Sequence, residues 1–334
     1  MFTRLLVPLD RSPLAEQALG PAAAIARGAC AAMDLVLVHQ PVASGGFGDL
    51  PWNAEQIVDE DRYLETIAGE LHDGASVSAS HAVLRGNAVE MICARAYDVS
   101  ANLIVMTSHG RTGLSRAWLG SVADGVLRRA GIPVLVLRAI ERKADRLVAS
   151  GLFKHLLIPL DGSPHSSEIL ASAAALARSC GARVTLLRVI EPVLTPSFEA
   201  PIPVQFGMPE TYPPSFADKP ATQRLVAEAE QHLLEVAATL AGQGVPQVET
   251  RVVVEWAAAQ AILDFARGNH VDVIAMSTHG RGASRLLVGS VADKVLRASG
   301  LPVLLEHPIS VRAATRPSEA ASDDSVITPF CLSP

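Results

Sequence analysis

The sequence of 334 residues predicts an α/β fold built from two tandem, doubly wound, Rossmann-like domains, each with a five-stranded parallel sheet and about four helices. Two observations show the duplication. The segment LLVPLDRSPLAEQAL at residues 5–19 returns as LLIPLDGSPHSSEIL at 156–170, and the segment 108–138 returns at 278–306. A third observation gives the class. Short apolar runs alternate with Ala-rich stretches of helix length, an order typical of parallel strands joined by right-handed helical crossovers.

The first half contains signals for each element in turn. Ser12 is a typical helix N-cap and Pro13 suits the first helical position, so a helix is expected from there to about Gly28. The run at 77–84 is less apolar than the others and is expected at a sheet edge. Strands are predicted at 4–9, 33–39, 77–84, 103–107 and 133–137, and further helices at about 54–72, at 87–99 and from 121 onward.

The second half repeats this order but has a long Pro-rich connection at 191–220. A connection longer than about 12–15 residues is usually functional or disordered, so a lid, an interface arm and a mobile insert all remain open. We expect the first domain at 1–140, a linker at 141–152, the second domain at 153–308 and a disordered tail at 309–334.

Composition argues against several classes of function. The net charge is −6 and aromatic residues make up 4%, which disfavours binding to nucleic acid. Four cysteines form no CxxC pair, so small buried thiols are favoured over a redox or metal site. The N-terminus does not resemble a signal peptide, and no apolar run reaches the ~18 residues of a membrane span. A cytoplasmic protein with no membrane association is expected.

The repeated loop before the last helix is the strongest candidate site. Gly110 and Gly120 flank nine residues, and Ser121 follows at once. Ser121 and Asp124 have capping-box spacing, so the serine could simply begin a helix. Alternatively, the glycine lets a ligand approach the helix N-terminus, whose N–H groups and partial positive charge suit phosphate. Basic residues add donors in both copies of the loop: His109, Arg111 and Arg116, then His279, Arg281 and Arg285.

A carboxylate ends the first strand of each half. Asp10 and Asp161 lie where a doubly wound sheet binds ligands, outside the carboxyl ends of its strands. Either carboxylate could accept hydrogen bonds from ribose hydroxyls or could cap its own turn. His109 and His279 could act as bases, but the sequence assigns them no partner. No GxxxxGK[ST], HExxH, GxSxG or clustered Cys/His set is present, and no GxGxxG follows a first strand.

Together these segments resemble the universal stress protein family in its tandem form. The motifs that carry the resemblance are VPLDRSP, IPLDGSP, VMTSHGRTGLSRAWLGSVADGVLRRAGIPVLVL and AMSTHGRGASRLLVGSVADKVLRASGLPVLL. It extends over nearly the whole chain to about residue 308. The nucleotide-binding branch of this family has a glycine, two residues, a glycine, nine residues, and then a glycine with serine or threonine.

The two halves match that pattern to different degrees. In the first half Gly110 and the pair Gly120-Ser121 match, with Thr107 in place of the first glycine. The second half has Ser277 at that place, and only eight residues separate its Gly280 from Gly289. We therefore expect the first site to bind better and the second to be weaker or altered.

The resemblance implies a role for each group of positions. Asp10 and Asp161 would face the ribose, and the backbone near Gln40 and Val189 would read the adenine edge. The glycine loops and serines would hold ribose and phosphates. The implied nucleotide-binding residues are Pro8, Leu9, Asp10, Gln40, Met106, Thr107, His109, Gly110, Arg111, Gly120, Ser121 and Val122, with Pro159, Leu160, Asp161, Val189, Met276, Ser277, Gly280, Arg281, Gly289, Ser290 and Val291.

The expected function is an ATP-binding stress regulator with little or no turnover, with any Mg or Mn ion bound through the phosphates. No residue is assigned as catalytic or as a metal ligand. Two alternatives are an interaction protein without a working nucleotide site, and a slow ATPase or autophosphorylating protein with Ser121 or Ser290 as acceptor. An unidentified protein partner is expected. The family pairs domains through the last strands, here 133–137 and 302–305, which implies an intrachain pseudo-dimer and allows a homodimer.

Overall fold

The computed structural model describes residues 1–39, 51–108, 119–138, 153–196, 215–278 and 289–307. The chain divides into two compact units, one containing residues 2–150 and the other residues 151–306. Each unit is described by itself.

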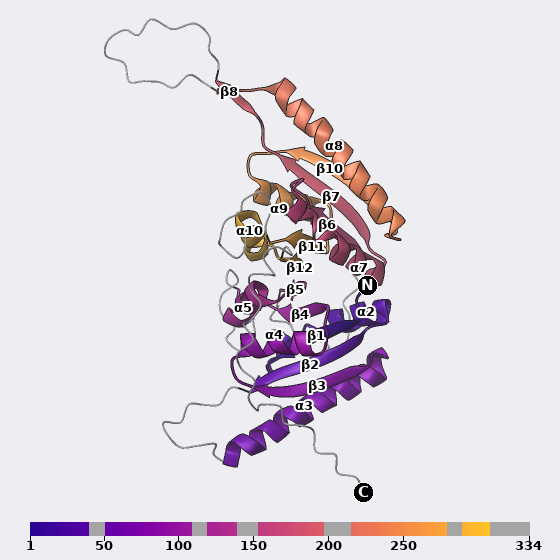
Figure 1. Ribbon diagram of the computed structural model, residues 1–334, viewed down its shortest axis with the longest axis vertical. Coiled ribbons are helices and arrows are strands. Elements are labelled where there is room, and N and C mark those ends of the chain that lie inside the picture. The colour runs from indigo at the N-terminus through magenta and orange to yellow at the C-terminus, as the bar shows by residue number, and fades with distance from the viewer. Residues whose placement is uncertain (40–50, 109–118, 139–152, 197–214, 279–288, 308–334) are drawn as a thin grey trace, which may run out of the picture. The chain divides into compact units, whose positions relative to one another are not determined.

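The first unit is a parallel sheet with helices on its faces (Figure 1). Its strands lie in the order β5-β4-β1-β2-β3. The long α3 lies along β3, α2 packs against α3, and α4 packs against α5. The elements are β1 (Arg4–Leu9), α1 (Pro13–Glu16), α2 (Leu19–Ala29), β2 (Ala32–His39), α3 (Pro51–Ala75), β3 (Ala79–Arg85), α4 (Ala88–Asp98), β4 (Leu103–Thr107), α5 (Ser121–Arg129) and β5 (Val134–Leu137).

The second unit repeats this architecture with the strand order β10-β7-β6-β11-β12. Here α8 lies along β10 and β7, as α3 does along β3 and β2. The elements are β6 (His155–Pro159), α6 (Pro164–Ser167), α7 (Leu170–Cys180), β7 (Arg183–Ile190), β8 (Leu194–Pro196), β9 (Ser215–Ala217), α8 (Lys219–Gly242), β10 (Val248–Val254), α9 (Ala258–Gly268), β11 (Val273–Ser277), α10 (Ser290–Ala298) and β12 (Val303–Glu306).

The fold class predicted from the sequence is confirmed. Every pairing within the two five-stranded arrangements is parallel, and the less apolar run predicted at an edge forms β3, which pairs with β2. The chain passes from β1 to β2 and β3 on one side, and then returns to β4 and β5 on the other. This reversal between β1 and β4 is the topological switch point, where doubly wound folds bind ligands.

Small aliphatic side chains build the core of each sheet. All five side chains of β4 are buried, as are all five of β11. The helices that cover the sheets are rich in buried alanine, for example α2 and α7. Because alanine brings a helix close to a sheet and costs little side-chain entropy, these aromatic-poor sequences still pack densely.

One local expectation needs correction. The helix predicted from Pro13 to about Gly28 is two helices, because Gln17 and Ala18 donate hydrogen bonds to carbonyls three residues back and tighten the chain there. For the Pro-rich connection at 191–220 the sequence left several roles open, and its described ends are folded. Its two ends pair as the antiparallel strands β8 and β9, and Asp218 caps α8. Residues 197–214 lie outside the described part.

None of the helices described is both long and apolar enough to cross a membrane.

Candidate functional site

The carboxyl ends of β1 and β4 form the candidate site of the first unit. These strands are parallel neighbours, with Leu5 opposite Leu103 and Leu6 opposite Ile104. The loop that follows β4 closes on itself, because the Gly120 N–H donates to the Ser108 carbonyl at 2.8 Å. The first turn of α5 therefore begins directly beside the end of β4.

The second unit has the same closure. The Gly289 N–H donates to the carbonyl of Thr278, and the Thr278 N–H donates to Glu306 at 2.9 Å. The same hydrogen bond thus joins the residues on either side of the loop in both units. The one-residue difference in length therefore lies within 279–288. Gly289 and Gly120 also share one backbone conformation, with φ near −62° and ψ of 151° at Gly289, and −61° and 151° at Gly120.

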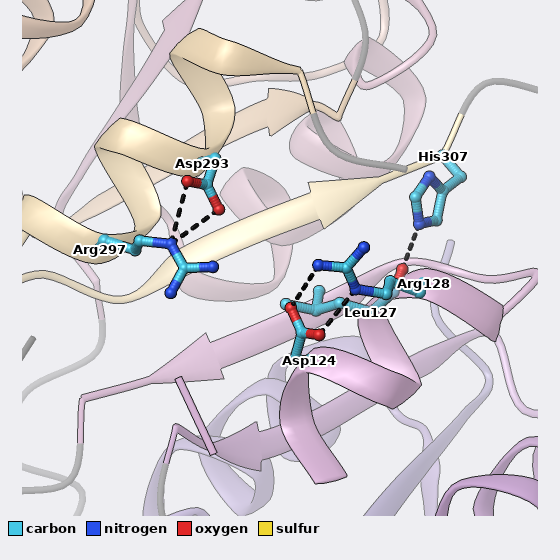
Figure 2. A network of polar contacts seen from close by, with 6 residues as sticks. All are labelled: Asp124, Leu127, Arg128, Asp293, Arg297 and His307. Atoms are coloured by element: carbon cyan, nitrogen blue, oxygen red, sulfur yellow. Dashed lines mark hydrogen bonds and ion pairs between the residues drawn. The ribbon is translucent and has the colours of Figure 1, made fainter. Parts of the chain in front are cut away.

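The sequence left two roles open for Ser121, and the capping box, one of the two, does not form. Gly120 is the N-cap of α5 and Ser121 is already the first helical residue, so the serine hydroxyl does not cap the helix. Asp124 does not reach back either. It binds Arg128 one turn further on, with Nε–Oδ2 at 2.7 Å (Figure 2). A Ser-x-x-Asp spacing fits a helix that begins one residue earlier equally well, and the Asp–Arg pair at i,i+4 favours that register.

The same correction applies to the second unit. Gly289 caps α10, Ser290 is its first residue, and Asp293 pairs with Arg297, with Nε–Oδ1 at 2.8 Å (Figure 2). Within the described residues no side chain caps either helix, and Ser121 and Ser290 are exposed. A helix N-terminus presents orphan N–H groups and about half a positive charge, so both ends are suited to an anion.

The strand-end carboxylates cap their own turns, one of the two roles the sequence allows. Asp10 Oδ1 accepts from the N–H of Ser12 at 3.0 Å and from its hydroxyl at 2.6 Å. Asp161 Oδ1 accepts from the N–H of Ser163 at 2.8 Å. A carboxylate has about four lone-pair sites, so capping a turn does not use its whole capacity. The turn fixes one oxygen and with it the direction of the carboxylate plane.

Two buried polar groups near the rim are missed by sequence reasoning. His39 ends β2, and its Nδ1 lies 2.9 Å from Oε2 of Glu60 on α3, with the two side chains 3% and 2% exposed. In the second unit Arg188 on β7 is 9% exposed. Strand pairing makes Ile190 the counterpart of His39 and Leu37 the counterpart of Arg188. A position-by-position alignment of the two halves reveals both differences.

The strand ends and helix starts bring one group of the proposed residues to each rim. In the first unit this group is Pro8, Leu9, Asp10, Met106, Thr107, Gly120, Ser121 and Val122, and in the second it is Pro159, Leu160, Asp161, Val189, Met276, Ser277, Gly289, Ser290 and Val291. The other six implied nucleotide-binding residues lie outside the described part, namely Gln40, His109, Gly110, Arg111, Gly280 and Arg281. The three further basic residues of the loops, Arg116, His279 and Arg285, also lie outside it.

Strand pairing also shows that the two positions expected to read the adenine edge are not equivalent in the two halves. Val189 is the counterpart of Val38, while Gln40 corresponds to Glu191, so Gln40 and Val189 are not equivalent places. The residues in place of the first pattern glycine are strand residues. Thr107 and Ser277 end β4 and β11, with exposed fractions of 6% and 7%. The Ser277 hydroxyl donates to the Glu306 carbonyl at 3.4 Å, so a small polar side chain fits there.

Comparison with known proteins agrees with this architecture. The sequence model of the universal stress protein family matches residues 1–138 and again 152–306. The chain belongs to this family. A universal stress protein of Thermus aquaticus is 34% identical over 155 residues, which is 46% of this chain and 98% of the relative. One from Mycobacterium tuberculosis is 31% identical over 214 residues, 61% of each chain.

A solved structure shows the same tandem fold. The universal stress protein of Archaeoglobus fulgidus covers 91% of this chain and 98% of its own, with a TM-score of 0.63 and 19% identity. At that identity the likeness extends to the fold alone.

This tandem universal stress protein shows no metal centre in the part of the chain that is described, since no three His, Cys, Asp or Glu side chains gather there. Burial raises the pKa of the Cys180 thiol to about 12 and that of Cys93 to about 11. Both thiols are therefore protonated at neutral pH. The expectation of small buried thiols is wrong for Cys30, which is exposed.

Proposed function

We propose that each half of this universal stress protein binds an adenine nucleotide, ATP in the first instance, and that nucleotide occupancy regulates its part in the stress response. One arrangement carries the proposal. At the switch point of each sheet, a helix that begins at glycine without a side-chain cap lies beside the end of a strand that is followed by an aspartate. Phosphate suits the first element and ribose hydroxyls suit the second.

Each part of the nucleotide has a matching chemistry. Phosphate oxygens would accept from the first N–H groups of α5 or α10, which Gly120 and Gly289 leave open to close approach. Asp10 or Asp161 would accept from the ribose. A divalent ion such as Mg or Mn would enter with the phosphates. Among the described residues, no cluster of acidic side chains could bind such an ion without the nucleotide.

Slow turnover is a further part of the proposal. Rapid hydrolysis needs a group that activates water and a means of stabilising charge on the transferred phosphoryl group. The described rim carries backbone donors and one turn-bound carboxylate in each half. Such a site holds a nucleotide as a signal and does little to accelerate its cleavage.

One observation favours a second candidate, autophosphorylation. Ser121 and Ser290 are exposed at the first helical position, beside the proposed phosphates, and their hydroxyls do not cap the helices. Incubation with γ-labelled ATP followed by peptide mapping tests this candidate. Label on Ser121 or Ser290, lost in the alanine variants, would support it, and absence of label would exclude it.

The location of the protein in the cytoplasm, an unidentified protein partner, pairing of the last strands and homodimer formation also remain proposals.

Calorimetric titration of the full chain with ATP tests the main proposal. Gly120→Val places a branched side chain at the N-cap of α5 and should abolish binding in the first half, and Gly289→Val should do so in the second. The double variant should bind no ATP.

Two matched controls make the same substitution after the same helices. Gly131 and Gly300 have open space where a Cβ would be, so Gly131→Val and Gly300→Val should leave ATP binding unchanged. Unchanged binding in the double Gly120→Val, Gly289→Val variant would show that the nucleotide binds elsewhere.

A further inference from the structure

Strand β10 of the second unit has an open row of backbone groups along one side. Among the described strands, β10 pairs only with β7. The Gln247 carbonyl accepts from Val184 of β7 at 2.8 Å, and the Glu255 N–H donates to Ile190 at 3.0 Å. Because successive residues of a strand direct their N–H and C=O groups to opposite sides, the odd-numbered residues of β10 bond β7. The even-numbered residues, with Thr250 at the centre, direct theirs outward.

The matching edge of the first unit has charged or ionisable side chains at two positions where this edge has none. Strand pairing makes Arg85 the counterpart of Val254, and His81 the counterpart of Thr250. His81 also contacts a carboxylate of α3 at 3.4 Å. Charged side chains on an edge strand hinder its pairing with another chain. In the second unit Val254 is 42% exposed, and Trp256 two residues further is 57% exposed.

Two opposite charges lie near the centre of β10, and their spacing is self-complementary. The side chains of Glu249 and Arg251 are 34% and 56% exposed, with Nη2 of the arginine 3.3 Å from Oε2 of the glutamate. In an antiparallel pair of β10 strands with Thr250 opposite its own copy, each Glu249 faces the partner's Arg251. The outward-facing residues then form the hydrogen-bonded pairs. The charged residues form the other type of pair, in which the side chains are closer.

The contacts that such a pairing replaces are exposed. In the single chain Arg251 Nη1 donates to the Thr250 carbonyl at 2.8 Å, so this carbonyl is accessible to a donor outside the β10–β7 ladder. The partner's Thr250 N–H would take its place. Arg251 would exchange Glu249 of its own chain for Glu249 of the partner. Because an exposed ion pair contributes little to stability, the exchange costs little and leaves no charge unpaired.

The charges and the apolar end both favour this register. A register centred on Val252 would set Glu249 opposite the partner's Glu255, and like charges directly opposite one another are destabilising. In the register centred on Thr250, Val254 lies opposite the partner's Pro246, which is exposed. Proline has no N–H, so it ends the ladder there and leaves a short, defined pairing.

We propose that the open edge of β10 binds the same edge of a second copy of this chain, antiparallel and centred on Thr250. The same strand forms both sides of the interface, as a two-fold axis requires. This surface is separate from the last strands, 133–137 and 302–305, and its pairing does not depend on a nucleotide. Because the two β10 strands run in opposite directions, the candidate sites of the two second units lie at opposite edges of the joined sheet.

Charge exchange tests the contact between the two copies. Sedimentation velocity of the full chain at micromolar concentrations should show reversible association. Glu249→Arg places arginine opposite arginine, and Arg251→Glu places glutamate opposite glutamate. Each single variant should therefore raise the Kd of association about tenfold or more. The double variant Glu249→Arg, Arg251→Glu restores both pairs and should associate as the parent does.

The double variant is also the matched control, because it reverses the same ion pair within each chain. Circular dichroism should show the parent fold in all three variants, whose changes are at partly exposed side chains. A parent chain that stays monomeric would overturn the inference. Association that both single variants leave unchanged would overturn it too, since the interface would then lie elsewhere on the chain.

A disulfide tests the register. In a Cys30→Ser, Cys331→Ser background, Thr250→Cys sets each thiol opposite its own copy, with the Cα atoms about 5.5 Å apart and within reach of a disulfide. The control Val252→Cys lies on the same face of β10, but its own copy is four residues away, roughly 14 Å along the pair. Mild oxidation should give a covalent dimer with Thr250→Cys and little with Val252→Cys. Equal yields, or a higher yield with Val252→Cys, would contradict the inference.

Discussion

Gly162→Ala gives a sharp test of the packing beneath the second turn. The residue has φ of +74°, where a side chain costs about 1 kcal/mol relative to glycine. The new Cβ would also lie 2.7 Å from Nη1 of Arg188 and would displace the guanidinium. Loss of its hydrogen bond to Leu160 adds about 2 kcal/mol, the scale for a buried charged donor. The expected loss of unfolding free energy is about 3 kcal/mol.

A matched control isolates the backbone contribution. Gly181 has φ of +64° and open space where a Cβ would be, so Gly181→Ala should cost only about 1 kcal/mol. Urea unfolding followed by circular dichroism measures both variants. In an Arg188→Leu background, Gly162→Ala should also fall to about 1 kcal/mol, which gives a coupling of about 2 kcal/mol between the two positions. Equal costs for Gly162→Ala and Gly181→Ala would refute the reasoning.

Three further predictions concern stability, thiol reactivity and pH. Arg95→Ala should destabilise the first unit by about 3–5 kcal/mol in urea, because it leaves the fully buried Asp34 carboxylate without its two-pronged partner at 2.9 Å. Cys30 should react with a thiol reagent in the folded protein while Cys180, with a pKa of about 12, should react only after unfolding, as read by peptide mass spectrometry. Burial, and then Arg183, lowers the pKa of His155, so the urea midpoint should fall as pH drops below 6.5, and His155→Gln should flatten that fall.

Each of these predictions has its own control or opposing result. Arg129→Ala breaks an exposed ion pair with Glu90 and should cost under about 1 kcal/mol, so an equal cost for Arg95→Ala would contradict the buried-pair argument. Labelling of Cys180 at the rate of Cys30 would show that its helix opens readily. For His155 the folded state favours the neutral form. Its contribution to the free energy of unfolding is therefore complete above pH 6.5 and is lost as the pH falls below that value. Identical pH profiles for the parent and His155→Gln would rule that out.

Repetition and hydrophobic period explain why the fold was predictable. Buried parallel strands such as β4 are continuous apolar runs, and a run less apolar than the rest marks the edge, as β3 confirms. The long connection was harder to interpret. Strands β8 and β9 are only three residues each, and β8 ends in proline, so neither strand has a detectable hydrophobic period.

The candidate site was only partly predictable, for physical reasons. A capping motif fixes a helix start to within a residue, and the displacement of Ser121 from N-cap to first helical residue changes what its hydroxyl does. The burial of His39 and Arg188 depends on the elements packed around them, and a local pattern does not record those elements. The sequence does reveal both residues when the two halves are compared, because each aligns with an aliphatic residue in the other half.

The nucleotide retained by the purified chain tests the central claim most directly. Native mass spectrometry of the gently purified protein, followed by denaturation and identification of the released small molecules, measures both the number and the chemistry of bound ligands. We predict up to two adenine nucleotides per chain, one lost in Gly120→Val and the other in Gly289→Val. A chain that releases no nucleotide and shows no thermal shift with millimolar ATP would contradict the account.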